Sequence, residues 1–178
     1  MNNFERNDNM HYSNKWKNWI TQVDEKTCKP CKSNNGKIYE ITEAVRPSPP
    51  LHPNCRCVIQ RMKSLFAGEA TSKKQEGADW YLKYKRILPD YYITKSEAEK
   101  LGYRSYLGNL NNICPNKMLI KGVYGNINKH LPDKNGRIWY EADINYTSGY
   151  RNHERILFSN DGLIFVTYDH YNTFTEVR

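Results

Sequence analysis

The fold of this chain is decided by residues 139–174, WYEADINYTSGYRNHERILFSNDGLIFVTYDHYNTF. Its apolar and alternating runs predict neighbouring strands of a half-buried antiparallel sheet. In and beside these runs lies an unusual set of charged residues: Glu141, Asp143, Arg151, Arg155, Asp169 and His170. A carboxylate, two arginines and a histidine are the groups that could break a phosphodiester without a metal, by moving protons and meeting charge on phosphorus. The alternative is an ordinary sheet with solvated charges.

The regions around this stretch complete the expected architecture. Alternating or apolar runs at 118–124, 137–143, 154–159, 163–168 and 173–177 predict strands. Three helices are expected before them: one from Asp79 to Leu88, one opened by a capping box at Thr94–Glu97, and one near Leu110–Ile113. Helices first and strands after predict an α+β domain with an antiparallel sheet.

Residues 79–178 closely resemble the barnase-type bacterial ribonucleases of the microbial guanyl-ribonuclease superfamily. The resemblance needs no gap and rests on LPDYYITKSEAEKLGY (88–103), GNL (108–110), GRIWYEADINYTSGYRNHERILFSNDGLIF (136–165) and TYDHYNTFTEVR (167–178). It implies the family's fold, in which N-terminal helices pack on a twisted antiparallel β-sheet. It also implies an endoribonuclease that cleaves single-stranded RNA.

The resemblance assigns the catalytic roles. Glu141 is implied to be the general base that takes the 2′-OH proton, and His170 the general acid that protonates the leaving 5′-oxygen. This transphosphorylation leaves a 2′,3′-cyclic phosphate, and no cofactor is expected for catalysis. Lys95, Arg151 and Arg155 match the cations that the family places around the scissile phosphate. Asp143 is expected to hold the two arginines by ion pairing rather than to react.

The chain departs from the family in its base-recognition loop. There the family typically reads Ser-Asn-Arg-Glu, and its Glu accepts hydrogen bonds from guanine. Here the loop after Tyr124 reads GNIN over 125–128, so the carboxylate is replaced by Asn128. We therefore expect a weakened guanine preference. The candidate substrate-binding residues are Tyr124, Gly125, Asn126, Asn128 and Tyr171.

Four of the five cysteines lie in the first third of the chain: Cys28, Cys31, Cys55 and Cys57. A C-x2-C pair and a C-x-C pair, brought together by a hairpin, would offer Zn²⁺ a tetrahedral set of thiolates, and His52 stands beside the second pair. Two disulfides, or free thiols, are the alternatives. The remaining histidines His11, His130 and His153 have no motif around them and are expected at the surface.

We expect three parts in the chain. Residues 1–62 form a small cysteine-rich module whose first 15 residues are polar and disordered. The strings DEKTC and PSPPLHPNCRC in this module resemble the C-terminal region of phage minor head (Mu F-like head-morphogenesis) proteins. Residues 63–78 lack periodicity and are interpreted as a linker. The ribonuclease-like domain then covers 79–178.

Net charge and hydropathy indicate which partners and which location to expect for this chain. The formal net charge of +8 favours a polyanionic partner. No apolar run approaches the ~20 residues of a membrane span, and no signal peptide is recognisable. Joined to the two resemblances, these observations lead us to expect a toxin secreted by a non-classical route that acts on RNA in the cytoplasm of a target cell. The resemblance to the barnase-type ribonucleases implies that an acidic barstar-like immunity protein neutralises it.

Two alternatives belong to other classes. A phage-head-like structural or RNA-binding protein without catalysis is disfavoured because both proton-transfer residues and all three cations occur together. A metal-dependent DNase is disfavoured because the C-terminal half lacks an acidic metal-binding cluster.

Overall fold

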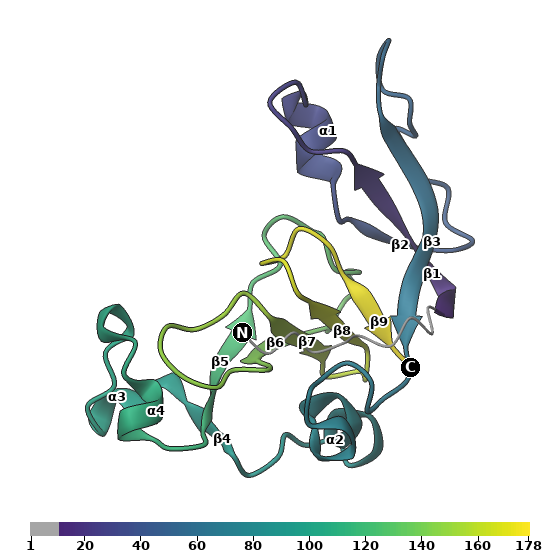
Figure 1. Cartoon of the computed structure of the whole chain (residues 1–178). Helices are drawn as coiled ribbons and strands as arrows, with labels where there is room; N and C mark the ends of the chain where they lie inside the picture. Colours follow the sequence, from purple (N-terminus) through teal and green to yellow (C-terminus); the bar gives the residue numbers. More distant parts are fainter. Residues whose placement is uncertain (1–10) are drawn as a thin grey trace.

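The computed structural model describes residues 11–178 (Figure 1). The first ten residues of the segment expected to be disordered lie outside the described residues. Residues 11–15 of that segment differ from the expectation, because they belong to the first strand, β1 (His11–Thr21). None of the helices within 11–178 has the length and apolar character needed to cross a membrane.

The described residues form an α+β fold around one nine-stranded sheet in the order β2-β1-β3-β9-β8-β7-β6-β5-β4. All neighbours are antiparallel except the pairs β3–β9 and β4–β5. The strands after β1 are β2 (Ile38–Glu40), β3 (Cys57–Leu65), β4 (Tyr92–Thr94), β5 (Met118–Tyr124), β6 (Trp139–Asp143), β7 (Arg155–Ser159), β8 (Ile164–Thr167) and β9 (Thr175–Val177). The helices are α1 (Lys29–Asn34), α2 (Ala78–Tyr84), α3 (Lys95–Lys100) and α4 (Leu110–Ile113), with single 3-10 turns η1 (Lys74–Glu76) and η2 (Ser105–Leu107). The expected strands and the capping box at Thr94 are confirmed.

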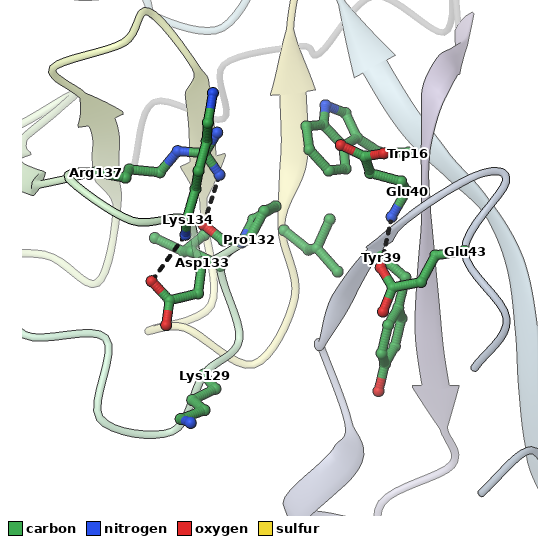
Figure 2. Close-up of a pocket in the computed structure, with 11 residues that line it drawn as sticks. Trp16, Tyr39, Glu40, Glu43, Lys129, Pro132, Asp133, Lys134 and Arg137 are labelled. Atoms are coloured by element: carbon green, nitrogen blue, oxygen red, sulfur yellow. Dashed lines mark hydrogen bonds between the residues drawn. The ribbon is translucent and has the colours of Figure 1, made fainter. Parts of the chain in front are cut away.

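The N-terminal module and the ribonuclease-like part share this sheet. β3 pairs in parallel with β9, and Leu65 is the partner of Val177. The indole of Trp16, 1% exposed, packs edge-on with its centroid 5.9 Å from that of Phe165 in β8. A pocket of about 380 Å³ lies where β1 and β2 face residues 129–137 (Figure 2). The two parts are therefore continuous in both sheet and core.

The segment expected to be a linker is ordered structure. Its first residues, 63–65, finish β3, and Ala70 and Thr71 are buried. The fully buried carboxylate of Asp79 fastens it by accepting hydrogen bonds from Gly68 N (2.7 Å), Ala70 N (2.9 Å) and Thr71 Oγ1 (2.9 Å). Asp79 lies inside α2, whose N-cap is Gly77. Because a buried carboxylate needs hydrogen-bond partners, its contacts order residues 68–71.

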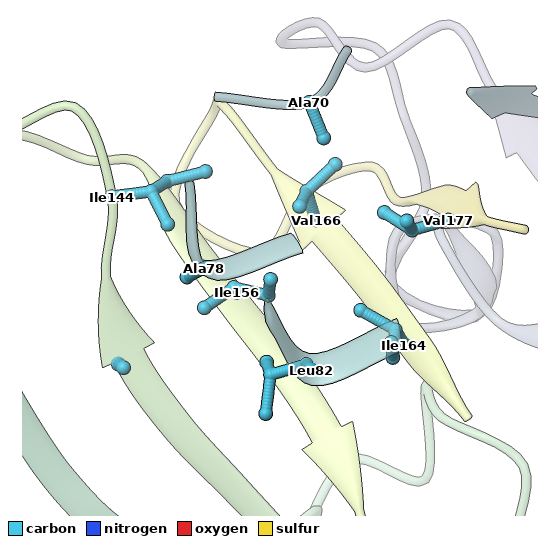
Figure 3. Packing of buried hydrophobic residues seen from close by; sticks show 9 residues of the cluster. Ala70, Ala78, Leu82, Ile144, Ile156, Ile164, Val166 and Val177 are labelled. Atoms are coloured by element: carbon cyan, nitrogen blue, oxygen red, sulfur yellow. The ribbon is translucent and has the colours of Figure 1, made fainter. Parts of the chain in front are cut away.

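The two faces of the C-terminal strands have different roles. Ala78 and Leu82 of α2 pack on Ala142, Ile156 and Val166 on one face (Figure 3). Because side chains alternate along a strand, the residues between these point to the opposite face. That second face, which we call the site face, carries three apolar residues and three charged residues: Trp139, Leu157, Phe165, Glu141, Asp143 and Arg155.

Candidate active site

The site face gathers the predicted charged residues around β6 and β7. Asp143 and Arg155 are direct register partners in these strands. The Asp143 carboxylate, fully buried, forms ion pairs with Arg151 Nε at 2.6 Å and with Arg155 Nε at 3.1 Å. The predicted structural role of Asp143 is confirmed, since it holds both arginines in place.

Glu141 lies two residues earlier on the same face and is 3% exposed. Its Oε1 accepts a hydrogen bond of 2.6 Å from the Tyr171 hydroxyl and lies 3.5 Å from Arg155 Nε. Burial, together with this carboxylate, raises the pKa of Tyr171, so the phenol stays a donor. Lys121 of β5 contributes an ammonium 3.4 Å from the same oxygen. The carboxylate thus sits among one donor and two cations.

His170 stands on the loop between β8 and β9, exposed beside this group. Its backbone N–H donates to His153 O at 3.2 Å, and the two imidazole centroids are 5.2 Å apart. Partial burial, followed by the charges of His153, Arg155 and Lys121, lowers the pKa of His170 below its ordinary value, while Glu141 opposes the shift. An imidazole with a lowered pKa releases its proton readily, as a general acid must.

The loop after β5 lies beside the same group. The rings of Tyr124 and Tyr171 stack with centroids 5.6 Å apart. The amide of Asn126 is used within the loop: its Nδ2 donates to Leu131 O at 2.8 Å, and its Oδ1 accepts from Leu131 N at 3.0 Å. Gly125 and Asn128 are exposed. Of the predicted base-binding side chains, Asn126 therefore shapes the loop, and Asn128 is free to face a ligand.

Lys95 occupies a different position from the other predicted cations. It begins α3, and its ammonium lies 3.4 Å from Glu99 in the same helix. The preceding Thr94 pairs with Ile120, so Lys95 starts at the level of Lys121 on the next strand. Among the described residues, the lysine that forms an ion pair with Glu141 is Lys121.

Sequence reasoning missed Lys121 and the closeness of His153 to His170. Lys121 lies where the β5–β6 register shifts, between Ile120 and Gly122, and Gly122 has a φ of 95°. Such a bulge re-aims a side chain toward its neighbours. The sequence signal for this bulge is Gly122, a glycine inside a predicted strand directly after Lys121.

A second group of functional side chains lies in the N-terminal module. The cysteines are free thiols, so the disulfide alternative is not formed. Two groups have metal-binding spacing, Cys28–Cys31–His52 and Cys31–Cys55–Cys57, and they share Cys31. His52 Nε2 is 3.2 Å from the sulfurs of both Cys28 and Cys31. The module could therefore hold a metal ion. His52 could be one of its ligands, although the sequence indicates it only as a neighbour of the second cysteine pair.

The spacing within the cluster fits a tetrahedral metal. Sulfurs bound at about 2.3 Å to a tetrahedral zinc lie roughly 3.8 Å apart, and the Cys31 and Cys55 sulfurs are 3.7 Å apart. Hydrogen bonds, first from the backbone of Leu51, lower the pKa of the Cys55 thiol to about 6. A thiol that ionises this easily is a good metal ligand.

Known proteins match both parts of the chain. Residues 67–178 match the family model described as ribonuclease, and residues 2–60 match that of Phage Mu protein F like protein. The ribonucleases of Bacillus intermedius and Bacillus pumilus are each 50% identical over 101 residues, which cover 57% of this chain and 62% of the relative. The ribonuclease of Heyndrickxia coagulans is also 50% identical over 101 residues, or 92% of its length.

The chain thus spans less than two thirds of the two Bacillus relatives. The match to the ribonuclease model, in contrast, includes every charged residue of the site face and both loops beside it. By this match over more than half of its residues, the chain belongs to the ribonuclease family.

Proposed function

We propose that the chain is an endoribonuclease toxin that cleaves single-stranded RNA without a metal, through a 2′,3′-cyclic phosphate. The observation that carries this proposal is the meeting of the buried Glu141 and Arg155 with the exposed Lys121 and the His170 loop on one face of the sheet, in a member of the ribonuclease family. An acidic immunity protein would cover the cations of this face in place of RNA.

In this proposal Glu141 takes the proton of the 2′-OH while that oxygen attacks phosphorus in line. The Tyr171 hydroxyl holds the carboxylate in place through its hydrogen bond to Oε1. Arg155 and Lys121, both within ion-pair distance of that oxygen, are placed to meet the charge that builds on the phosphoryl oxygens. One such fixed donor typically contributes about 3–4 kcal/mol to transition-state stabilisation.

His170 protonates the departing 5′-oxygen, and the two residues exchange roles when the cyclic phosphate is hydrolysed. The requirement for a 2′-OH makes RNA, and not DNA, the substrate. His170 works from its protonated form. Because its pKa lies below the ordinary value, activity should fall as the pH rises through that lowered pKa.

The first prediction concerns these two groups. Glu141→Gln or His170→Ala should each lower kcat/KM on RNA by at least ~10²-fold, the usual contribution of one positioned base or acid. His153→Ala should move the alkaline limb of the pH–rate profile to higher pH, because it removes a charge that lowers the pKa of His170.

Rates and pH profiles of the purified variants test this prediction. His11→Ala is the matched histidine control, since its ring lies in β1 and packs against Phe66, directly after β3. Full activity in both the Glu141 and the His170 variants would remove the assignment.

Base preference depends on the exposed loop at 125–128. Guanine presents N1–H and N2–H₂ as adjacent donors, and a carboxylate can accept from both. Asn128 offers one neutral amide oxygen, and the amide of Asn126 is already bonded to Leu131. Losing a charge-assisted pair in exchange for at most one neutral bond costs about 1–2 kcal/mol of discrimination. Stacking on Tyr124 or Tyr171 holds any base with little selectivity.

The second prediction follows from this arithmetic. GpN dinucleotides should be cleaved less than ~30-fold faster than ApN, the ratio that about 2 kcal/mol allows. Asn128→Glu should raise this ratio by restoring the carboxylate. Values of kcat/KM on GpA, ApA, UpA and CpA measure it. Strict guanine dependence of the unmodified protein would mean that another group reads the base.

We further propose that the cysteine cluster binds one structural Zn²⁺ through Cys28, Cys31, Cys55 and His52. The support is the His52 ring, which contacts two of the sulfurs, and the Cys31–Cys55 spacing. The Cys57 sulfur lies within 4.8 Å of the Cys31 and Cys55 sulfurs, but it is buried and 3.1 Å from Thr21 Oγ1, so we propose His52 as the fourth ligand in its place. Cysteine thiolates and imidazole are ligands that zinc prefers, and the bound ion would stabilise a module with little core of its own.

The third prediction is a zinc content of about one per chain in protein purified without added metal. Elemental analysis should show this zinc lost in Cys28→Ser and His52→Ala but retained in Cys57→Ser. Cys114→Ser, which changes a buried cysteine in the ribonuclease-like part, is the control. An intact mass showing two disulfides and no metal would contradict the proposal.

A further inference from the structure

The loop that carries His170 needs to be held in place. His170 and Tyr171 have φ angles of 57° and 69°, a left-handed conformation that is costly for residues other than glycine. The loop ties itself partly through Asp169, whose carboxylate accepts from Thr173 N at 2.9 Å and Thr173 Oγ1 at 2.7 Å. Thr167 Oγ1 accepts from Tyr171 N at 2.9 Å. These contacts lie within the loop or at the end of β8, and the His170 N–H and the Tyr171 hydroxyl add bonds to His153 O and Glu141 Oε1 in the ribonuclease-like part.

A tie from outside comes from the N-terminal module. Asn35, buried at the end of α1, donates from Nδ2 to Asn172 O at 3.1 Å. Its Oδ1 accepts from Thr21 N of β1 at 2.9 Å. Both ends of this amide are therefore used, one on the module and the other on the loop, two residues after His170.

The neighbouring glycine shows how close this contact is. Gly36 has a φ of 83°, and a Cβ added there would lie 2.6 Å from Asn172 O. Backbone therefore packs on backbone where α1 meets the loop. Any side chain at this position would push the loop away.

The N-terminal module also anchors the loop after β5, which lies beside the site. Ile38 N of β2 donates to His130 O at 2.8 Å, which anchors the end of the loop after β5. The half-buried His130 ring contacts the edge of Phe174, with the centroids 6.1 Å apart, and burial lowers the pKa of this histidine. His130 is thus a packed residue of the junction, where the sequence indicated a surface histidine.

We infer that the N-terminal module is a working part of the ribonuclease site and that Asn35 is a positioning residue for His170. The inference rests on the proposed cleavage function and names how that site is held. A general acid must lie within hydrogen-bond reach of the leaving oxygen, and a displacement of about 1 Å can cost ~10²-fold in rate. Alongside the bonds to His153 O and Glu141, the Asn35–Asn172 hydrogen bond holds the loop from outside the family's own domain.

Asn35→Asp tests the inference, because it keeps an acceptor for Thr21 N and removes the donor to Asn172 O. Asn34→Asp is the matched control. It makes the same change one residue earlier, where Nδ2 donates to Pro30 O within α1 at 2.9 Å. Asn35→Asp should lower kcat on RNA by about tenfold or more with KM nearly unchanged, and Asn34→Asp should stay within about twofold of the unmodified protein.

A second readout does not depend on activity. The imidazole proton resonance of His170, identified by its loss in His170→Ala, should change its shift and its titration midpoint in Asn35→Asp and not in Asn34→Asp. If Asn35→Asp fails to fold, Gly36→Ala replaces it, with Gly136→Ala as control. Gly136 has a similar φ of 78° and nothing within 4 Å of an added Cβ.

The outcomes separate this inference from the proposed function. Cleavage by the unmodified protein, with equal kcat and an unchanged His170 resonance in the Asn35 and Asn34 variants, would overturn the inference alone. Absence of cleavage by the unmodified protein would overturn the proposed function, and the His170 resonance would still decide whether Asn35 positions that residue.

Discussion

The site depends on one buried carboxylate, that of Asp143. It has no solvent exposure, and it is compensated by the guanidinium groups of Arg151 and Arg155. Removing one partner of a buried ion pair typically costs about 3–5 kcal/mol, because the other charge is left without compensation. Since Arg155 also reaches Glu141, the same pairing sets the distance between the proposed base and its nearest buried cation. The Asp143 carboxylate, which is not proposed to react, thus fixes the surroundings of the proposed base.

The sheet gathers these paired groups on one face. Alternation along β6 and β7 sends Ala142 and Ile156 toward α2 and sends Glu141 and Arg155 to the other face. The apolar end of that face is covered by Trp16 and Met62 of the N-terminal module. At its charged end Glu141, Asp143 and Arg155 are buried, and the exposed groups beside them are Lys121 and His170. The module therefore covers the apolar end of the face and leaves Lys121 and His170 exposed at the other end.

Much of this arrangement could be predicted from local signals. The capping box at Thr94, the strands of the C-terminal half and the pairing role of Asp143 each depend on residues close in sequence or on a regular period, and each is confirmed. What failed depends on distant partners. Residues 68–71 look like linker until the Asp79 carboxylate binds them, and Lys121 becomes a site residue only through a bulge opposite Glu141. His52 and Asn35 likewise contact partners 21 to 137 residues away in the sequence, separations that no periodicity reveals.

The central claim is that a carboxylate and an imidazole break RNA by moving protons, with fixed side-chain cations meeting the charge. Its most direct test is ³¹P NMR of the RNA fragments that the purified protein produces in excess EDTA. The account predicts 2′,3′-cyclic phosphate ends that appear first and then convert slowly to 3′-phosphate. Fragments ending in 5′-phosphate, or cleavage abolished by EDTA, would contradict it.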